Sequence, residues 1–198
     1  MDFKKFPEEL KKAISILTLK VDKMKEVAAN KESLIWGLIF VLAPALVNII
    51  LMRISLSGSG LGSFVSGLLF WPFLIPVLAI GGMTVTTVLV AEKAYKAKID
   101  YNSFVRVSLY AYIVGAISLV ATLFLVLGIT GLYYILVDLS VLGFLAVLLV
   151  QFKMLMDMFS VKKNDAIVAV VSGGAAYFLL SFILGKLFLG MFYQFLYF

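Results

Sequence analysis

The sequence contains neither cysteine nor histidine, and only 14% of its 198 residues are charged. Without those two side chains there can be no disulfide, no thiolate nucleophile, no imidazole acid–base catalyst and no zinc or haem site of the usual kind. The low charge also excludes a disordered chain, because disorder needs many charged and few apolar residues. We therefore expect no enzymatic activity, no catalytic residue, no metal site and no cofactor.

Apolar residues are in excess: they make up 63% of the sequence, and its mean hydropathy is +1.10. One small water-soluble core cannot bury so much apolar surface. A hydrocarbon layer about 30 Å thick takes about 20 apolar residues per helix. The sequence predicts an all-α integral membrane protein with five transmembrane helices in residues 33–198. We place these helices at 33–52, 72–91, 104–127, 132–159 and 166–188.

Residues 1–32 differ from the rest, since they hold eight of the seventeen basic residues and six of the eleven acidic ones. Their apolar residues recur at three- and four-residue steps, which predicts a cytoplasmic amphipathic helix. Pro7 suits its first turn, and adjacent Glu8 and Glu9 are expected on its solvated face. Such a helix can lie on membrane lipid or pack against the bundle, and a protein partner is a third alternative. The predicted stripe comprises Phe3, Phe6, Leu10, Ile14, Leu17, Val21, Met24 and Ala28.

The basic residues outside this segment alternate along the chain. Four lie around the second connection and three around the fourth, whereas the first connection has only Arg53 and the third has none. Basic residues favour the cytoplasmic side of a membrane. The pattern predicts a multi-pass protein with its N-terminus in the cytoplasm and its C-terminus outside.

A few polar residues fall within the predicted spans, where they are costly. Asp138 and Lys186 come at similar depth on antiparallel helices, so we expect them to face the bundle and pair, with Asn48 or Arg53 nearby. Such a pair either orients the helices or contributes to a transport or proton path. Near the inner face, Gln151, Lys153 and Asp157 form a candidate partner contact or an interfacial anchor; the last two are four residues apart.

Small residues form stripes on two predicted spans. Such stripes let membrane helices approach closely. We expect contacts within the chain rather than dimerisation, although the sequence does not define the oligomeric state. The stripes contain Ser108, Ala111, Gly115, Ser118 and Thr122 in the third span, and Ala166, Ala169, Gly173 and Ala176 in the fifth.

The arrangement of an amphipathic segment before five spans resembles the Ypt-interacting-protein (YIP) family, in its prokaryotic form. The likeness is strongest from Val90 to Ser118, where a span ends in an Ala-Lys-type segment before a polar turn, and residues 141–159 are similar in style to the family's fourth span. The Asp-Leu-x-Gly-Pro motif of the eukaryotic N-terminal segment is absent, as is the proline of the third span. The resemblance therefore implies a membrane-organising or trafficking-like role without carrying over the binding of prenylated GTPases.

Two functions follow as hypotheses. The first is a non-enzymatic membrane adaptor or scaffold whose charged cytoplasmic segments bind lipid or a protein. The second is a small transporter or channel subunit with a polar path near Asp138 and Lys186, in which Pro72, Pro76 and Gly81–Gly82 break a helix. A transporter requires a cavity that reaches Asp138. Nucleic acid is not an expected partner, because acidic residues nearly balance the lysines of residues 1–32.

Overall fold

The computed structural model describes residues 3–56 and 70–197, and every regular element in them is helical. Two short α-helices precede a bundle of long ones. The third predicted span consists of three consecutive helical segments, which together cover residues 101–126. The elements are η1 (Phe3–Lys5), α1 (Phe6–Leu17), α2 (Val21–Ala29), α3 (Ser33–Leu56), α5 (Phe70–Lys93), α6 (Tyr101–Ala111), η3 (Tyr112–Val114), α7 (Gly115–Val126), α8 (Thr130–Asp157) and α9 (Lys163–Tyr197).

Among the described residues, five segments are long and apolar enough to cross a membrane, which agrees with the predicted number. They are Ser33–Leu51, Leu74–Lys93, Tyr101–Val126, Thr130–Asp157 and Lys163–Leu187. The second helix begins two residues before the expected start. The sequence leaves open whether residues 64–91 form one helix or two, and residues 64–69 lie outside the described residues. The last helix continues through the aromatic tail, nine residues beyond its predicted end at 188.

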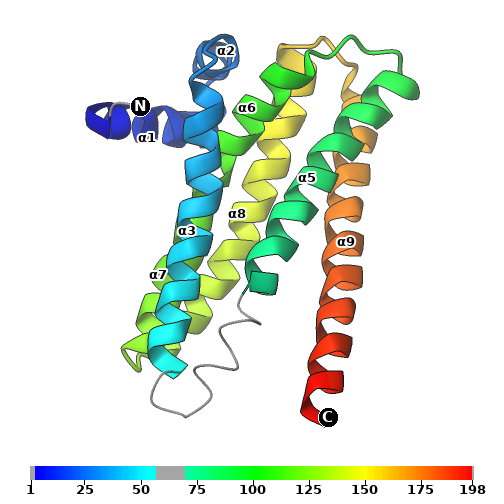
Figure 1. The fold of residues 1–198 in the computed structure, drawn as a ribbon. Coiled ribbons are helices and arrows are strands. Elements are labelled where there is room, and N and C mark those ends of the chain that lie inside the picture. The colour runs from blue at the N-terminus through cyan, green and yellow to red at the C-terminus, as the bar shows by residue number, and fades with distance from the viewer. Residues whose placement is uncertain (1–2, 57–69, 198) are drawn as a thin grey trace.

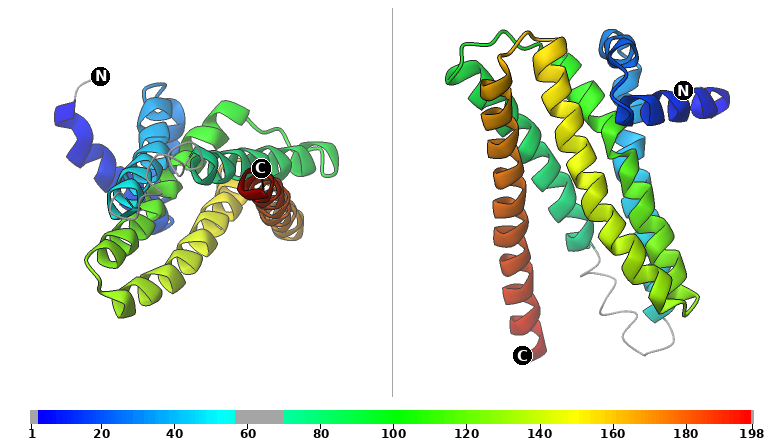
Figure 2. Two further views of the ribbon diagram at one scale, coloured as in Figure 1. Left: turned by 60° about the horizontal axis from the view of Figure 1, so that its bottom comes forward. Right: turned by 180° about the vertical axis from the view of Figure 1, so that it is seen from behind.

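The long helices form an open bundle (Figure 1). Helix α5 packs along α9, and α3 packs along α6 and α7, while α7 lies beside α8. Helices α8 and α9 meet where residues 158–162 join them and separate toward the other end, as both Figure 1 and the right view of Figure 2 show. Their inner surfaces therefore do not meet along their whole length.

The charged segments of the chain gather at one end of this bundle. Helix α2, residues 94–100 and residues 158–162 all lie at that end, whereas the turn at residues 127–129 lies at the opposite one (Figure 1). We call the end that holds α2 the lysine-rich end, because it carries the N-terminal lysines and those of the second and fourth connections. The alternation of basic and uncharged connections along the sequence thus becomes a separation in space.

The N-terminal segment is two helices and not the single predicted one. The chain turns at Leu19, whose φ of 61° is left-handed. The Lys20 amide donates to the Ser15 carbonyl and the Leu19 amide donates to the Ile16 carbonyl, at 3.2 and 2.8 Å. This is a Schellman ending, which normally places glycine at the left-handed residue. A leucine there gives no composition signal, so the apolar periodicity runs through a break in the helix.

The face that α1 buries differs from the predicted stripe, whereas α2 buries part of that stripe. In η1 and α1, Ala13 and Ile16 are fully buried, while the stripe residues Phe3 and Ile14 are 71% and 53% exposed. In α2, the stripe residue Met24 is fully buried. The buried residues of α1 lie beside the stripe and not on it, so docking leaves the stripe partly exposed along α1. One face of α1 therefore packs against the bundle, while the neighbouring face is exposed. The structure is consistent both with packing on the protein and with docking on membrane lipid.

The small-residue stripes lie at contacts between helices of the chain. Ala111 and Ala169 are fully buried, and the Ser118 hydroxyl accepts a 3.3 Å hydrogen bond from the Asn48 side chain of α3. A Cβ atom at Gly173 would overlap the Thr87 hydroxyl of α5, while one at Gly115 would approach Pro44 of α3 to 3.9 Å. Small residues thus allow α9 to pack closely on α5, the most extensive helix pair in the bundle.

Candidate functional site

The expected Asp138–Lys186 pair does not form. Asp138 is exposed on α8, and Lys186 is exposed on α9 with its Nζ atom 5.5 Å from the ring centre of Phe182. No ion pair joins them among the described residues. Because α8 and α9 diverge from the lysine-rich end, equal depth along the two helices does not make these residues neighbours. The sequence predicts this pair only because the two residues lie at similar depth on antiparallel helices.

The other two residues expected beside this pair lie on α3. The side chain of Arg53 is outside the described part of the structure. The Asn48 Nδ2 atom donates to the Ser118 Oγ atom, while its Oδ1 atom is buried without a hydrogen-bond partner. Of the four polar candidates predicted within the spans, Asn48 is the one whose described side chain is directed into the bundle. It does not lie beside the acid–base pair that the sequence predicts.

Asn48 lines a cavity of about 370 Å³ between α3, α5, η3, α7, α8 and α9. Pro44 and Pro76 stand on two of its walls, inside α3 and α5. A proline inside a helix cannot complete the backbone hydrogen bond to the preceding turn. Other lining residues are Tyr112, Ser118, Phe144 and Tyr177. Neither Asp138 nor Lys186 lines this cavity.

The three inner-face candidates do not form one surface. Gln151 is fully buried: its Nε2 atom donates to Ser108 of α6 at 3.4 Å, and its Oε1 atom accepts from Thr87 of α5 at 3.3 Å. Lys153 and Asp157 form a 2.7 Å ion pair across one turn at the partly exposed end of α8. Gln151 therefore links three helices inside the bundle, and its expected place on an accessible face is wrong.

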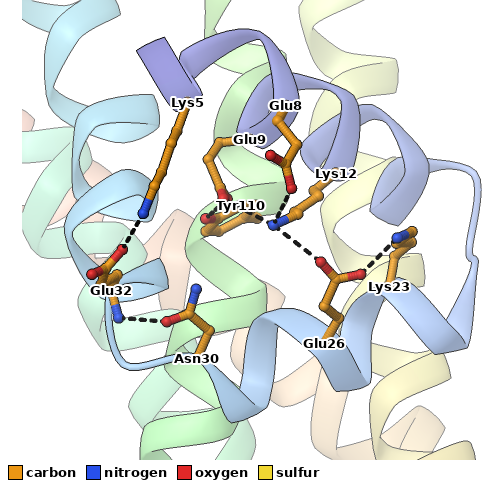
Figure 3. A network of polar contacts seen from close by, with 9 residues as sticks. All are labelled: Lys5, Glu8, Glu9, Lys12, Lys23, Glu26, Asn30, Glu32 and Tyr110. Carbon is orange, nitrogen blue, oxygen red and sulfur yellow. Dashed lines mark hydrogen bonds and ion pairs between the residues drawn. The ribbon is translucent and has the colours of Figure 1, made fainter. Parts of the chain in front are cut away.

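A polar network that the sequence did not suggest fastens α1 to the lysine-rich end (Figure 3). Glu9 was expected on a solvated face, yet it is only 3% exposed. Its Oε2 atom accepts a 2.5 Å hydrogen bond from the Tyr110 hydroxyl of α6, and its Oε1 atom lies 2.9 Å from the Lys12 Nζ atom. Lys12 also pairs with Glu8 at 3.1 Å and with Glu26 of α2 at 3.0 Å. One lysine thus joins both N-terminal helices.

The charges of this network stabilise one another. Burial lowers the pKa of Lys12, but its hydrogen bonds to Glu9, Glu26 and Glu8 outweigh that effect, so the pKa rises above its ordinary value. Hydrogen bonds from Lys23 and Lys12 lower the pKa of Glu26. Lys12 and Glu26 consequently keep their charged forms at neutral pH. The network fixes the position of α1.

Helix α2 is held by its C-terminal end. The guanidinium of Arg106, on α6, donates a 2.6 Å hydrogen bond to the Ala28 carbonyl, and the Ser103 hydroxyl donates to the same oxygen at 3.4 Å. A helix leaves its last carbonyls without partners in the helix. A cation at this end is favourable both because it donates hydrogen bonds to these carbonyls and because it interacts with the negative end of the helix dipole. Helix α6 therefore holds both N-terminal helices, α1 through Tyr110 and α2 through Arg106.

A second hollow, of about 320 Å³, opens at the lysine-rich end between the α5–α6 and α8–α9 connections. Lys96, Lys98 and Lys162 line it together with Asp165 in the first turn of α9. This hollow is polar and basic, unlike the cavity inside the bundle. The described residues contain no cluster of three acidic side chains able to hold a metal ion.

Comparison with known proteins yields no relative: no family model, no curated protein and no solved structure matches this chain.

Proposed function

We propose that the protein is a non-enzymatic integral membrane adaptor or scaffold, as the YIP resemblance implies, and that its lysine-rich end faces the cytoplasm. The gathering of the charged segments at one end of five apolar helices supports this orientation. Basic segments are retained on the cytoplasmic side during insertion. With this orientation the C-terminus lies outside, and the lysine-rich end carries the interaction surface.

The observation that carries the proposal is the position of α1. Helix α1 runs across the bundle and not along it (Figures 1 and 2). The rings of Phe3 and Phe6 lie 6.3 and 6.1 Å from the ring of Trp36, and Phe6 also meets Phe40 at 6.4 Å. Phe40 lies seven residues inside α3, about 10 Å along its axis at 1.5 Å per residue. The apolar stripe is therefore directed toward the spans, as for a helix lying in the membrane surface.

Lipid is the partner that fits this arrangement best. The exposed apolar stripe on α1 would enter the boundary between headgroups and acyl chains, and the lysines of the lysine-rich end would attract anionic lipid. Lys96, Lys98 and Lys162 place further positive charge at the same end of the bundle. A protein partner on this face is the second candidate, since the side of α1 away from the stripe carries the charged residues Glu8 and Lys11.

The transport alternative is less well supported. It required a cavity reaching Asp138, with Lys186 opposite it. The cavity in the bundle has neither residue in its wall and carries no charged side chain. The broken helix that this alternative expects is also absent from the described residues, because α5 continues through Pro72, Pro76 and Gly81–Gly82.

Spin labels on α1 test the membrane position directly, and the absence of cysteine makes single labels possible without background. We expect a label at Ile14→Cys to collide with dissolved oxygen and one at Glu8→Cys to collide with an aqueous nickel reagent, in vesicles containing anionic lipid. Both positions are exposed in the structure and lie on different sides of the same helix. Two labels that respond equally to the aqueous reagent would contradict the proposed position of α1.

Photocrosslinking in native membranes tests the second candidate, a protein partner on this face. Crosslinkers at Lys25 and Lys98 occupy exposed positions at the lysine-rich end, and one at Tyr134, which is 66% exposed, is the control at the opposite end. We expect the same protein adduct from the first two positions and none from Tyr134. Adducts from Tyr134 alone would place the interaction surface at the wrong end.

A further inference from the structure

We propose that the hollow between the α5–α6 and α8–α9 connections binds a phosphomonoester group, carried by a lipid headgroup or by a soluble phosphate ester. The ammonium groups of Lys96, Lys98 and Lys162, which line this hollow, would donate to the terminal oxygens of that group. The inference rests on the proposed function, in which the lysine-rich end attracts anionic lipid, and it adds the site and the chemical group. The position of α1 does not depend on it.

The first step is that the three lysines of the hollow lack an acidic partner within the described part of the chain. Asp165 lines the same hollow, yet it forms no ion pair with any of them. Lys12 and Lys153, in contrast, each pair with a nearby carboxylate. The lining side chains thus carry three positive charges and one negative charge, a formal net charge of +2. Because these like charges repel, an anion between them is attracted by all three.

The second step is that the backbone fixes both connections. Residues in the left-handed conformation follow the last turns of α5 and α8, with φ of 56° at Lys96 and 55° at Ser160. The next amide in each case, that of Ala97 or of Val161, donates to a carbonyl of the preceding helix at 3.1 or 2.9 Å. Both helices therefore end in Schellman turns, which set the direction of the chain through the hollow.

Side-chain packing holds the same two connections against the bundle. Ile99 and Val161, one from each connection, belong to the buried apolar core. The ring of Phe159, in the wall of the hollow, meets the ring of Phe104 on α6 at 6.3 Å, and Phe104 is fully buried. The lysines are consequently brought together by the fold itself, so a ligand does not have to order the two connections when it binds.

The third step is the place of the hollow relative to the apolar helices. The spans of α5 and α8 end at Lys93 and Asp157, and that of α9 begins at Lys163. The hollow is lined by residues 95–98 and 159–162 and by Asp165, so it adjoins the ends of three spans. The polar headgroups of a bilayer lie directly beyond its hydrocarbon layer. A lipid phosphate can therefore reach the hollow while its acyl chains stay among the spans.

The fourth step is the chemistry that matches the charge. A phosphomonoester carries about −1.5 to −2 charges at neutral pH and presents three terminal oxygens. Lysine ammonium groups bind phosphate as point charges with three donors each. A phosphodiester has one negative charge and would leave the hollow positive. The volume of about 320 Å³ lies within the range of small-molecule sites. Phosphatidic acid, whose headgroup is a phosphomonoester, fits both the charge and the place.

Native mass spectrometry of the full chain in detergent micelles tests this preference. The probes are phosphatidic acid and phosphatidylglycerol with identical acyl chains, so that they differ only in carrying a phosphomonoester or a phosphodiester. We expect phosphatidic acid to bind about tenfold more tightly, the effect of one further charge-assisted hydrogen bond. Equal dissociation constants for the two lipids would overturn the proposal.

Matched variants show whether the hollow is the site. Glutamine in place of its three lysines should weaken the binding of phosphatidic acid about tenfold or more. Glutamine in place of three other lysines at the same end should change it by less than about twofold, because exposed charges act weakly at a distance. All six positions are exposed: the first variant combines Lys96→Gln, Lys98→Gln and Lys162→Gln, and the control combines Lys11→Gln, Lys20→Gln and Lys25→Gln.

Equal weakening by the two triple variants would indicate a general attraction between lysines and anionic lipid. That result would overturn the hollow as a site and leave the proposed lipid partner standing. Conversely, spin labels that contradict the position of α1, together with a retained preference for phosphatidic acid, would count against the proposed function and not against the hollow.

Competition with glycerol 3-phosphate distinguishes the two sources of the phosphomonoester. If an excess of this soluble ester leaves the phosphatidic acid bound, the ligand is the lipid. If it displaces the lipid from the unchanged protein and binds the Lys96, Lys98 and Lys162 variant more weakly, the hollow takes the free ester as well. Both results support a phosphomonoester site, whereas equal binding of phosphatidic acid by that variant and the unchanged protein would refute it.

Discussion

The hydroxyl of Tyr110 donates a 2.5 Å hydrogen bond to the Glu9 carboxylate and thereby joins residues 101 positions apart in the chain. Tyr110 is fully buried on α6 and also meets the ring of Phe40 on α3 at 5.2 Å. It therefore connects the third span, the first span and the N-terminal segment. The position of α1 on the bundle depends on this contact as well as on the ring contacts of Phe3 and Phe6 with Trp36.

Removing the Tyr110 hydroxyl should loosen α1. In Tyr110→Phe the aromatic packing persists, but the buried Glu9 oxygen loses a donor, which costs about 1–3 kcal/mol of unfolding free energy. The matched control is Tyr134→Phe, because that side chain is 66% exposed. Denaturant unfolding in detergent measures the difference, and equal stability of the two variants would contradict a role for the hydrogen bond.

Stability should depend on pH at both extremes. The pKa of Lys12 is raised from its ordinary 10.5, so its contribution is complete below that pH and is lost as the pH rises through the folded-state value. The pKa of Glu26 is lowered from 4.5, so its contribution is complete above that pH and is lost as the pH falls through the folded-state value. The contributions of Lys12 and Glu26 are therefore both complete from about pH 4.5 to 10.5.

Two variants separate these effects. Thermal unfolding of Glu26→Gln should lose less stability in acid than the unchanged protein, and Lys12→Met should lose less in alkali. The Lys12 variant should also be markedly less stable at neutral pH, because it leaves the buried Glu9 carboxylate without its cation. Parallel pH profiles for all three proteins would show that these groups do not control the stability.

A methyl group at Gly173 should disturb the packing of α9 on α5. The new Cβ atom would overlap the Thr87 hydroxyl and lie 2.9 Å from the Met83 carbonyl, so Gly173→Ala should cost about 1–3 kcal/mol. Gly185→Ala on the same helix has open space around it and should be neutral or stabilising by up to about 1 kcal/mol. The order of the two melting temperatures checks this prediction, and a less stable Gly185 variant would reverse it.

Asp138 and Lys186 should act independently. Both are exposed and no ion pair links them, so the effects of Asp138→Leu and Lys186→Leu on the unfolding free energy should add within about 0.5 kcal/mol. A double-mutant cycle measures this sum. A coupling of several times that size would mean that the two side chains meet in the membrane after all.

The sequence predicts the five long helices and the place of the charged connections well, because both depend on composition over many residues. Twenty apolar residues in succession satisfy their own backbone only as a helix, whatever the rest of the chain does. The turn at Gly128 is predictable from a single residue type: its φ is 77°, a conformation that glycine tolerates.

The contacts between helices are not predictable in this way. The left-handed turn at Leu19 has no glycine to mark it, and the burial of Glu9 depends on a tyrosine from a distant span. For Asp138 and Lys186 the sequence predicts a contact that does not form, because the two residues lie at similar depth on helices that diverge. The cavity at Asn48 likewise needs the relative positions of Pro44 and Pro76, which no single segment contains.

The most direct test of the account is the side of the membrane on which each end of the bundle lies. Single cysteines at Lys25→Cys and Gly131→Cys occupy exposed positions at the lysine-rich end and the opposite end, and an added Cβ at Gly131 meets no neighbour. With a membrane-impermeant maleimide on intact cells, we predict labelling of Gly131→Cys at once and of Lys25→Cys only after permeabilisation. Labelling of both cysteines from the same side would contradict the five-span topology and the proposed cytoplasmic surface with it.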